Sequence, residues 1–156
     1  MRFDNPKPKN PMPLDHERLI VYQRSIEFVA WADRFMEETK LKGEIRSQLD
    51  RASISAPLNI AEGNGKFSIR DRIRFLDIAY GSSLECAACL DVACAKGAAP
   101  VERIAQGKSL IEETVNLLVR LRESLNRRLD EKESSPRVRE GDEDEWFSLR
   151  DLEVGY

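Results

Sequence analysis

The 156-residue sequence has few of the residues on which most catalytic centres depend. It contains one histidine, His16, which lies at the predicted start of a helix. A di-metal site in a helix bundle usually needs Glu-x-x-His pairs on facing helices, so the sequence excludes that chemistry. It also lacks a histidine-based triad, a glycine-rich phosphate loop, paired catalytic carboxylates and a nucleophile elbow. We therefore predict no catalytic residue, no cofactor and no enzymatic activity.

Cysteine is also scarce, with three residues at Cys86, Cys89 and Cys94. An odd number argues against a disulfide framework. Three soft ligands could hold a copper or zinc ion. All three lie, however, in rows of small apolar residues on a predicted helix, where cysteine acts as a compact apolar side chain. We predict that they pack in the core and that there is no metal site.

Long hydrophobic stretches are missing too. No run of about 18 apolar residues is present, so we predict no membrane-spanning helix. The first 13 residues contain four prolines and no apolar segment of the kind found in signal peptides. The expected location is the cytoplasm.

The charge is small in total and uneven along the chain. Residues 131–156 hold nine acidic and four basic residues, a net charge of −5. The remaining 130 residues hold 19 acidic and 21 basic residues, a net charge of +2. The totals therefore lack the strongly basic footprint of many nucleic-acid-binding domains, and they indicate an acidic C-terminal tail.

Apolar residues recur at helical spacing through most of the chain and predict four helices, over residues 15–40, 44–63, 68–96 and 100–132. Asp15 is the expected N-cap of the first helix, and Gly43 is expected to stop it. Its main apolar stripe is predicted to be Leu19, Tyr22, Ile26 and Val29, widened by Val21, Phe28, Ala32 and Phe35.

The later helices carry clear start and stop signals. Ser68 and Asp71 form a short capping pair at the start of the third helix, and Lys96-Gly97 suits its end. Pro100 is well placed as the first residue of the fourth helix. Because the loops are short, we expect an all-α, antiparallel up-down-up-down four-helix bundle. The predicted domains are a proline-rich, extended N-terminal arm (1–14), the bundle (15–132) and the acidic C-terminal tail (133–156).

The second predicted helix is apolar on two sides. Ile45, Leu49, Ala52, Ala56 and Ile60 make one face, and Ile54, Leu58 and Ala61 lie nearly opposite. A helix that is apolar on two sides is covered on two sides, and in a small bundle the second cover is often another subunit. We therefore predict that Ile54 and Leu58 lie in or near an oligomer interface.

Pro57 interrupts the hydrogen-bond ladder of that helix. It should bend the helix and free the carbonyl near Ser53. The hydroxyls of Ser53 and Ser55 are candidates to satisfy the freed backbone groups.

Arg51, Asn59 and Glu62 form a predicted polar cluster on the second helix. The carboxylate of Glu62 opposes the helix dipole in the last turn and should therefore have a specific donor. Arg51, Arg46 or an arginine of the third helix could be that donor. Both a structural ion pair and a ligand role stay open.

Basic residues crowd the start of the third helix. Lys66, Arg70 and Arg74 are candidates for contacts with nucleic-acid phosphates, and a ring of identical subunits would repeat them. The alternative is a solvated charged face with intrahelical pairs to acidic neighbours such as Asp71 and Asp77.

The C-terminal tail combines an acidic run with large apolar residues. It is either a solvated extension or a segment that docks on a partner protein or on the bundle itself. The docking candidates are Trp146, Phe147, Leu149 and Leu152.

A string of small and polar residues around Pro57 in the second helix goes beyond what core packing requires, and two further strings accompany it. Their residues are Gln48-Leu49, Arg51-Ala52-Ser53, Ser55 and Asn59-Ile60-Ala61-Glu62-Gly63 in the second helix; Phe75-Leu76-Asp77-Ile78-Ala79-Tyr80-Gly81-Ser82-Ser83-Leu84-Glu85 in the third; and Leu19, Val21, Tyr22 and Gln23 at the opening of the first.

These strings resemble the signature of the bacterial four-helix bundle family, also called the 23S rRNA intervening-sequence protein family. The resemblance covers residues 15–130. It implies an intracellular antiparallel bundle that assembles into a homopentamer. Related accessory proteins of diversity-generating retroelements form similar five-fold barrels and bind nucleic acid and a reverse transcriptase.

Two hypotheses about function follow. The first is a non-enzymatic, homo-oligomeric binding module whose partner is RNA or another nucleic acid. The second is a protein-interaction scaffold that presents its acidic tails to a partner protein. Deleting the tail would abolish partner binding under the second hypothesis but not RNA binding under the first.

Overall fold

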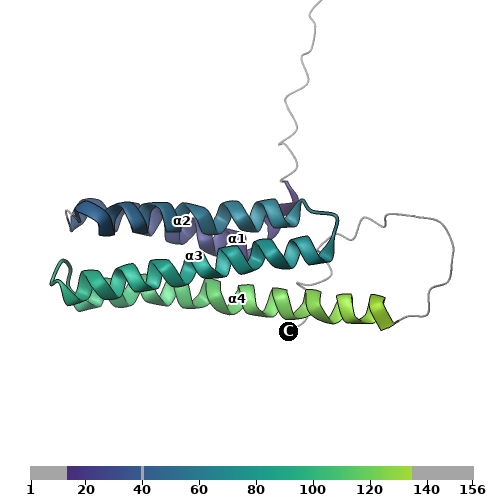
Figure 1. The fold of residues 1–156 in the computed structure, drawn as a ribbon. Coiled ribbons are helices and arrows are strands. Elements are labelled where there is room, and N and C mark those ends of the chain that lie inside the picture. Colours follow the sequence, from purple (N-terminus) through teal and green to yellow (C-terminus); the bar gives the residue numbers. More distant parts are fainter. Residues whose placement is uncertain (1–13, 40, 135–156) are drawn as a thin grey trace, which may run out of the picture.

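The computed structural model describes residues 14–39 and 41–134, which form four antiparallel helices lying side by side (Figure 1). No strand is present in these two ranges. The prediction of an all-α four-helix bundle is therefore confirmed. The elements are a 3-10 helix η1 (Asp15–Arg18), α1 (Ile20–Glu38), α2 (Gly43–Asn64), α3 (Ile69–Ala95) and α4 (Val101–Ser134).

Each helix packs against two neighbours. α1 contacts α2 and α4, and α3 contacts the same two helices from the other side. Figure 1 shows that the α2–α3 turn and the end of α4 lie at one end of the bundle, with the α3–α4 connection at the other. Residues that are far apart in the sequence, in the α2–α3 turn and in the last turns of α4, are thereby brought to the same end.

The chain enters the bundle differently from the prediction. Asp15 does not cap α1, because residues 15–18 form η1 and Leu19 adopts an extended conformation (φ −72°, ψ 122°) before α1 begins. The Glu17 carboxylate accepts a 2.6 Å hydrogen bond from the Leu14 N–H. The break at Leu19 turns that side chain inward, and it is buried.

The core-facing side of α1 also differs from the predicted main stripe. Val21, Phe28, Ala32 and Phe35 are buried, whereas Ile26 is 43% exposed. Of the predicted main stripe, Leu19 is buried and Tyr22 packs against the core, so the stripe departs from the prediction at Ile26, whereas the row predicted to widen it is buried.

The connection from α1 to α2 also differs from the prediction. α1 ends at Glu38, and the hydroxyl of Thr39, its C-cap, donates a 2.6 Å hydrogen bond to the Phe35 carbonyl. Gly43 does not stop α1 but opens α2, with φ +67°, a left-handed conformation that favours glycine.

The second helix runs without interruption through its proline. Pro57 is buried inside α2. The two nearby serines do not serve the carbonyl of Ser53 as predicted. Ser53 donates to the Asp50 carbonyl at 2.8 Å, and the Ser55 hydroxyl shares a 2.8 Å hydrogen bond with the Ser82 hydroxyl of α3.

The predicted caps of α3 are confirmed. The Ser68 side chain accepts from the Asp71 N–H at 3.4 Å. Lys96 is the C-cap, and Gly97 follows with φ +63°. Pro100 lies just outside α4 rather than inside it, and its carbonyl accepts from the N–H groups of Arg103 and Ile104.

The core is divided into two clusters along the bundle axis. One surrounds Trp31, Phe35 and Leu90. The other lies towards the α2–α3 turn, and its buried members are Leu19, Val21, Ile60, Leu76, Ala79, Leu118 and Leu125.

The prediction about membrane-spanning helices can be compared with the hydropathy of the described helices. Among the described helices, α3 alone contains a window that is long and apolar enough to cross a membrane by length and composition. Core helices of bundles meet the same criterion. Only 39% of that window is buried in the bundle, so α3 carries apolar surface outward as well as inward.

Candidate oligomer and nucleic-acid interface

The outward face of α2 carries the two predicted interface residues. Ile54 is 43% exposed and Leu58 is 62% exposed, whereas Leu49 and Ile60 on the opposite face are fully buried. The prediction that α2 is apolar on two faces is confirmed. Beside Ile54 and Leu58 lies a shallow groove of about 450 Å³, lined by Asp50, Arg51, Ile54, Ser55, Leu58, Asn59 and Glu62.

The three residues of the predicted polar cluster all line this groove, but they bond to different partners. The Asn59 carboxamide donates to the Ser55 carbonyl at 2.8 Å and to the Ser55 hydroxyl at 3.2 Å. Arg51 contacts Gln48 and lies 3.6 Å from the Glu44 carboxylate. The Asn59 amide therefore reinforces the link between α2 and α3 at Ser55, while Arg51 lies over the exposed surface.

The partner of Glu62 differs from the predicted arginines. Its carboxylate pairs with the Lys66 ammonium at 3.0 Å, one turn further along the chain. The same ammonium lies 4.7 Å from the centre of the Phe75 ring. Glu62 and Lys66 thus tie the last turn of α2 to the start of α3, which favours a structural ion pair.

Gly63, the last residue of the Asn-Ile-Ala-Glu-Gly string, lets α2 and α3 approach closely. A Cβ at this position would come within 2.8 Å of the Cβ of Phe75. No ordinary side chain fits that distance. Part of the signature therefore serves the packing of α2 on α3, with Ile60 in the core and Gly63 at the closest approach.

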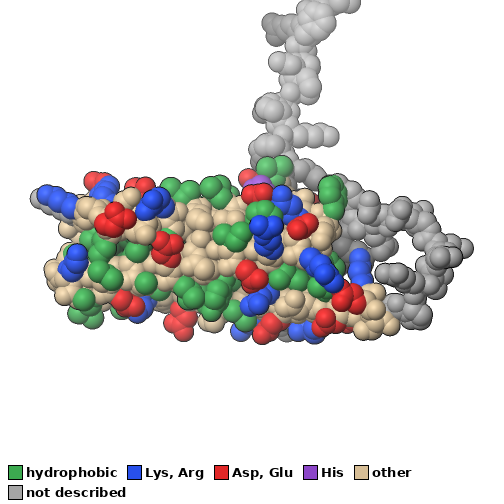
Figure 2. Space-filling model, viewed as in Figure 1, with side chains coloured by type: hydrophobic (Ala, Val, Ile, Leu, Met, Phe, Trp, Pro, Cys, Tyr) green, Lys and Arg blue, Asp and Glu red, His purple; other side chains and the backbone are tan. Residues whose placement is uncertain are grey.

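The contribution of α3 to the apolar surface was not predicted. Ile78, Leu84 and Val92 are exposed, and none of them is among the buried residues of α3. Figure 2 shows hydrophobic side chains between charged ones along α2 and α3 on this side of the bundle. The sequence does carry a signal for this surface, because these three large aliphatic residues occupy positions of α3 that do not face the core.

The three predicted phosphate-contacting residues lie near the α2–α3 turn. Lys66 pairs with Glu62, and Arg70 pairs with Glu133 in the last turn of α4. Arg74 is exposed and forms no ion pair within the described ranges. The predicted intrahelical pairs to Asp71 and Asp77 are not the ones formed, since Asp77 pairs across helices with Arg122 at 2.9 Å.

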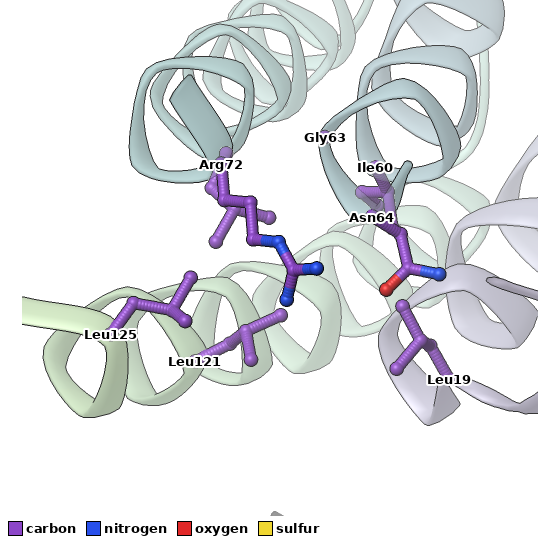
Figure 3. Close-up of a pocket in the computed structure, with 8 residues that line it drawn as sticks. Leu19, Ile60, Gly63, Asn64, Arg72, Leu121 and Leu125 are labelled. Atoms are coloured by element: carbon purple, nitrogen blue, oxygen red, sulfur yellow. The ribbon is translucent and has the colours of Figure 1, made fainter. Parts of the chain in front are cut away.

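A fourth basic residue at this end, Arg72, was not among the predicted site residues. Its guanidinium extends from α3 towards α4, over a small pocket between the helices (Figure 3). Its Nε–H donates a 2.6 Å hydrogen bond to the Lys66 carbonyl. Burial and the nearby charge of Arg128 lower the pKa of Arg72.

The position of Arg72 could have been found from the sequence. It lies four residues before Leu76, which faces the core, so the helical period places its Cα on the inward side of α3. The pocket beneath it is lined by Leu19, Ile60, Gly63, Asn64, Arg72, Leu76, Leu121 and Leu125.

The cysteines lie where the apolar interpretation places them. Cys86 and Cys89 are buried, and Cys94 is partly exposed. Burial raises the pKa of the Cys86 thiol to about 12. A thiol in this environment stays protonated at neutral pH and packs as a small apolar group. Within residues 14–39 and 41–134, no three side chains of His, Cys, Asp or Glu are grouped closely enough to hold a metal ion.

The tail candidates Trp146, Phe147, Leu149 and Leu152 lie outside the described residues, as does the predicted N-terminal arm up to residue 13.

Comparison with known proteins places the chain in a family. The sequence model described as 23S rRNA-intervening sequence protein matches residues 17–120. A solved structure from Bacteroides thetaiotaomicron, a protein of unknown function from the S23 ribosomal protein family, has a similar fold with a TM-score of 0.62. The two chains are 22% identical, and the match covers 65% of this chain and 97% of the other. No curated protein matches the chain. Because the family match spans more than half of the sequence, the protein belongs to the 23S rRNA-intervening sequence protein family.

Proposed function

We propose that this protein is a non-enzymatic binding module that assembles from identical copies in the cytoplasm and binds RNA. The proposed number of copies is five, because the motifs of the chain resemble those of the 23S rRNA intervening-sequence protein family and this resemblance implies a homopentamer. The observation that carries the proposal is the exposed apolar face of α2, at Ile54 and Leu58, beside an open groove.

The case for self-assembly depends on where the apolar surface lies. Exposed apolar side chains are common singly, but a patch shared by two adjacent helices marks an interaction surface. Ile54 and Leu58 are exposed on α2 and line one groove, and Ile78 is exposed on the neighbouring α3, so both helices contribute apolar surface. The groove adds polar groups of both signs, in Arg51 and Glu62, which could fix the register of a second copy.

The case for RNA depends on the basic residues at the α2–α3 turn. Arg74 is exposed, with no carboxylate partner among the described residues, and Arg70 and Lys66 lie near it in the chain. One such group is a weak site, because each exposed cation contributes little by itself. Repetition around an oligomer lets one RNA contact several groups at once and strengthens binding without new contacts.

Two measurements on the purified full chain test the proposal. Light scattering after size-exclusion chromatography gives the mass of the particle, which should be a multiple of the chain mass. Filter binding of a labelled RNA hairpin across a salt series should show an affinity that falls as salt rises, because phosphate contacts release counterions.

The outcomes separate the two parts of the proposal. A particle that stays single at high concentration contradicts the assembly. An RNA affinity that does not change with salt, or no binding at all, contradicts the phosphate contacts. An oligomer without RNA binding would favour the scaffold hypothesis, which a tail deletion then tests by loss of a protein partner.

A further inference from the structure

A layer of buried hydroxyl groups separates the two core clusters. In α1, Ser25 lies between Val21 of one cluster and Phe28 of the other. Small buried residues hold the corresponding positions of the other helices, namely Ser53 and Ala56 in α2, Ser82 and Ser83 in α3, and Thr114 in α4. Because the four helices lie side by side (Figure 1), these residues share one level of the bundle. The five serine and threonine residues at this level are called the hydroxyl layer.

A small cavity lies within the hydroxyl layer and is lined by residues of all four helices. Its polar lining comes from Ser25 in α1, Ser83 and Cys86 in α3, and Thr114 in α4, and Ala56 supplies the contribution of α2. The cavity offers about 10 Å³ to a water-sized sphere. That is the space which one water molecule requires, and larger ligands do not fit.

The three hydroxyls that line the cavity use their protons within their own helices. Ser25 donates to the Tyr22 carbonyl at 2.6 Å, and Ser83 donates to the Ala79 carbonyl at 2.9 Å. Thr114 donates to the Leu110 carbonyl at 3.0 Å. A hydroxyl group has one proton to donate but two lone pairs that accept. The three oxygen atoms are therefore left as acceptors, and no side chain of residues 14–39 and 41–134 donates a hydrogen bond to them.

The outer part of the hydroxyl layer shows how the chain satisfies such an acceptor. Ser82 likewise donates to a carbonyl of its own helix, that of Ile78 at 3.0 Å. Its oxygen lies 2.8 Å from the Ser55 hydroxyl, which therefore donates to it. The Ser55 oxygen in turn accepts from the Asn59 carboxamide at 3.2 Å. The acceptors between α2 and α3 thus have side-chain donors, and those around the cavity require a donor from outside the chain.

We infer that the cavity is a hydration site, in which one buried water molecule joins α1, α3 and α4. The water donates its two protons to two of the three oxygens of Ser25, Ser83 and Thr114 at any one time. Its own oxygen accepts the S–H of Cys86, a weak donor. Three hydrogen bonds are typical of a buried water. Hydration of this cavity depends neither on RNA binding nor on self-assembly.

The water and the hydroxyl layer together fix how the helices are placed along the bundle axis. A slide of one helix by a single turn, about 5.4 Å, would move its hydroxyl from the water into an apolar cluster. The same slide would set an apolar side chain against the remaining hydroxyls. Burial of polar groups without hydrogen-bond partners is costly, so the layer favours one register of the four helices.

Oxygen-17 magnetic relaxation dispersion on the purified full chain tests the site. It counts water molecules that stay bound while the protein tumbles, and it does not respond to hydroxyl protons. Combining Ser25→Ala, Ser83→Ala and Thr114→Val removes the three acceptors and leaves an apolar cavity, which stays dry. The count of long-lived waters should fall by one per chain. Ser83→Val alone should give the same loss, since it removes an acceptor and adds a methyl group at a position that lines the cavity.

Ser53→Ala is the matched control. Ser53 and Ser25 are both 2% exposed, and each donates to the carbonyl three residues before it, but Ser53 does not line the cavity. Ser53→Ala should therefore keep the count of the unmodified chain. An unmodified chain without a long-lived water overturns the inference, whether or not the variants fold. A count that the triple variant and Ser83→Val leave unchanged overturns it as well.

Urea unfolding at one protein concentration tests whether the water joins α1 to α4. Ser25→Ala and Thr114→Val are measured singly and together. Because both side chains contact the same water, the combined change in the unfolding equilibrium constant should differ about fivefold from the product of the single changes. For Ser53→Ala with Thr114→Val, the single changes should multiply. If they multiply in both pairs, no water links α1 to α4 and the inference is wrong.

Discussion

The indole ring of Trp31 in α1 lies directly against the backbone of Gly107 in α4. A Cβ at residue 107 would come within 2.8 Å of the Leu90 side chain and closer still to the Trp31 ring. Trp31 also stacks on Phe35, with ring centres 4.8 Å apart. A glycine inside a helix thus creates the space that the largest side chain of the core occupies.

We predict that Gly107→Ala destabilises the protein by about 1–3 kcal/mol, because the added methyl group overpacks the core at a rigid aromatic ring. Thermal and urea unfolding, followed by circular dichroism, measure the change. Gly81→Ala in α3 is the matched control, since a Cβ there meets no atom within 4 Å. A Gly107→Ala chain as stable as the unmodified one would contradict the packing described above.

Substitution of Ile54 tests the oligomer interface. Ile54→Glu should lower the mass of the particle measured by light scattering, because it places a charge in an apolar contact, while the helix content stays the same. Ile26→Glu is the matched control: Ile26 on α1 is also 43% exposed, but it lies on another side of the bundle. If both variants keep the mass of the unmodified particle, the interface lies elsewhere.

The phosphate contacts are tested at Arg74. Arg74→Gln should weaken RNA binding and reduce the slope of log affinity against log salt by about 0.7–0.9, the value for one lost phosphate contact. Arg34, near the end of α1, is also exposed and forms no ion pair in the described part of the chain. Arg34→Gln removes the same charge and should leave the slope unchanged. Equal effects of the two substitutions would indicate a response to net charge alone.

The raised pKa of Cys86 predicts a loss of stability at high pH. The ordinary pKa of the thiol is 9.0, and burial raises it to about 12 in the folded chain. Between these values the unfolded chain loses the proton and the folded chain keeps it, so the free energy of unfolding falls by up to about 1.4 kcal/mol per pH unit. The contribution is fully present below pH 9 and is lost as the pH rises towards 12.

Urea unfolding at several pH values checks this slope. The Cys86→Ala variant is less stable overall but should lose less stability per pH unit above pH 9, because it has no thiol to titrate. Parallel slopes in the two chains would contradict the burial of Cys86. A thiol reagent at pH 8 should likewise label the partly exposed Cys94 before Cys86.

Local signals predicted much of the fold. Ser68 caps α3 and Gly97 follows its end as expected, because a cap depends on a few neighbouring residues. The two apolar faces of α2 also follow from spacing alone. The start of α1 and the exposure of Ile26 could not be predicted in this way. They depend on which side of α1 meets the neighbouring helices, and the core that takes up Leu19 is formed with residues that are distant in the sequence.

The sequence predicted which residues make up the candidate site, but it did not predict their ion-pair partners. Ile54, Leu58, Arg51, Asn59 and Glu62 do line one groove. The partner of Glu62 is a lysine one turn away, and Arg70 pairs with a residue 63 positions later. Ion-pair partners depend on which helices are adjacent and on where α4 ends, and spacing within one helix carries no information about either.

The sequence by itself determined the number and order of the helices, the family and the two-sided character of α2, because helical periodicity and capping are local properties. Only the tertiary structure decided which stripe of α1 faces inward, where the α4 end meets the α2–α3 turn, and that Arg72 lies beside Arg128. These are relations between helices, and they are fixed by the packing of side chains such as Trp31 on Gly107 and Phe75 on Gly63.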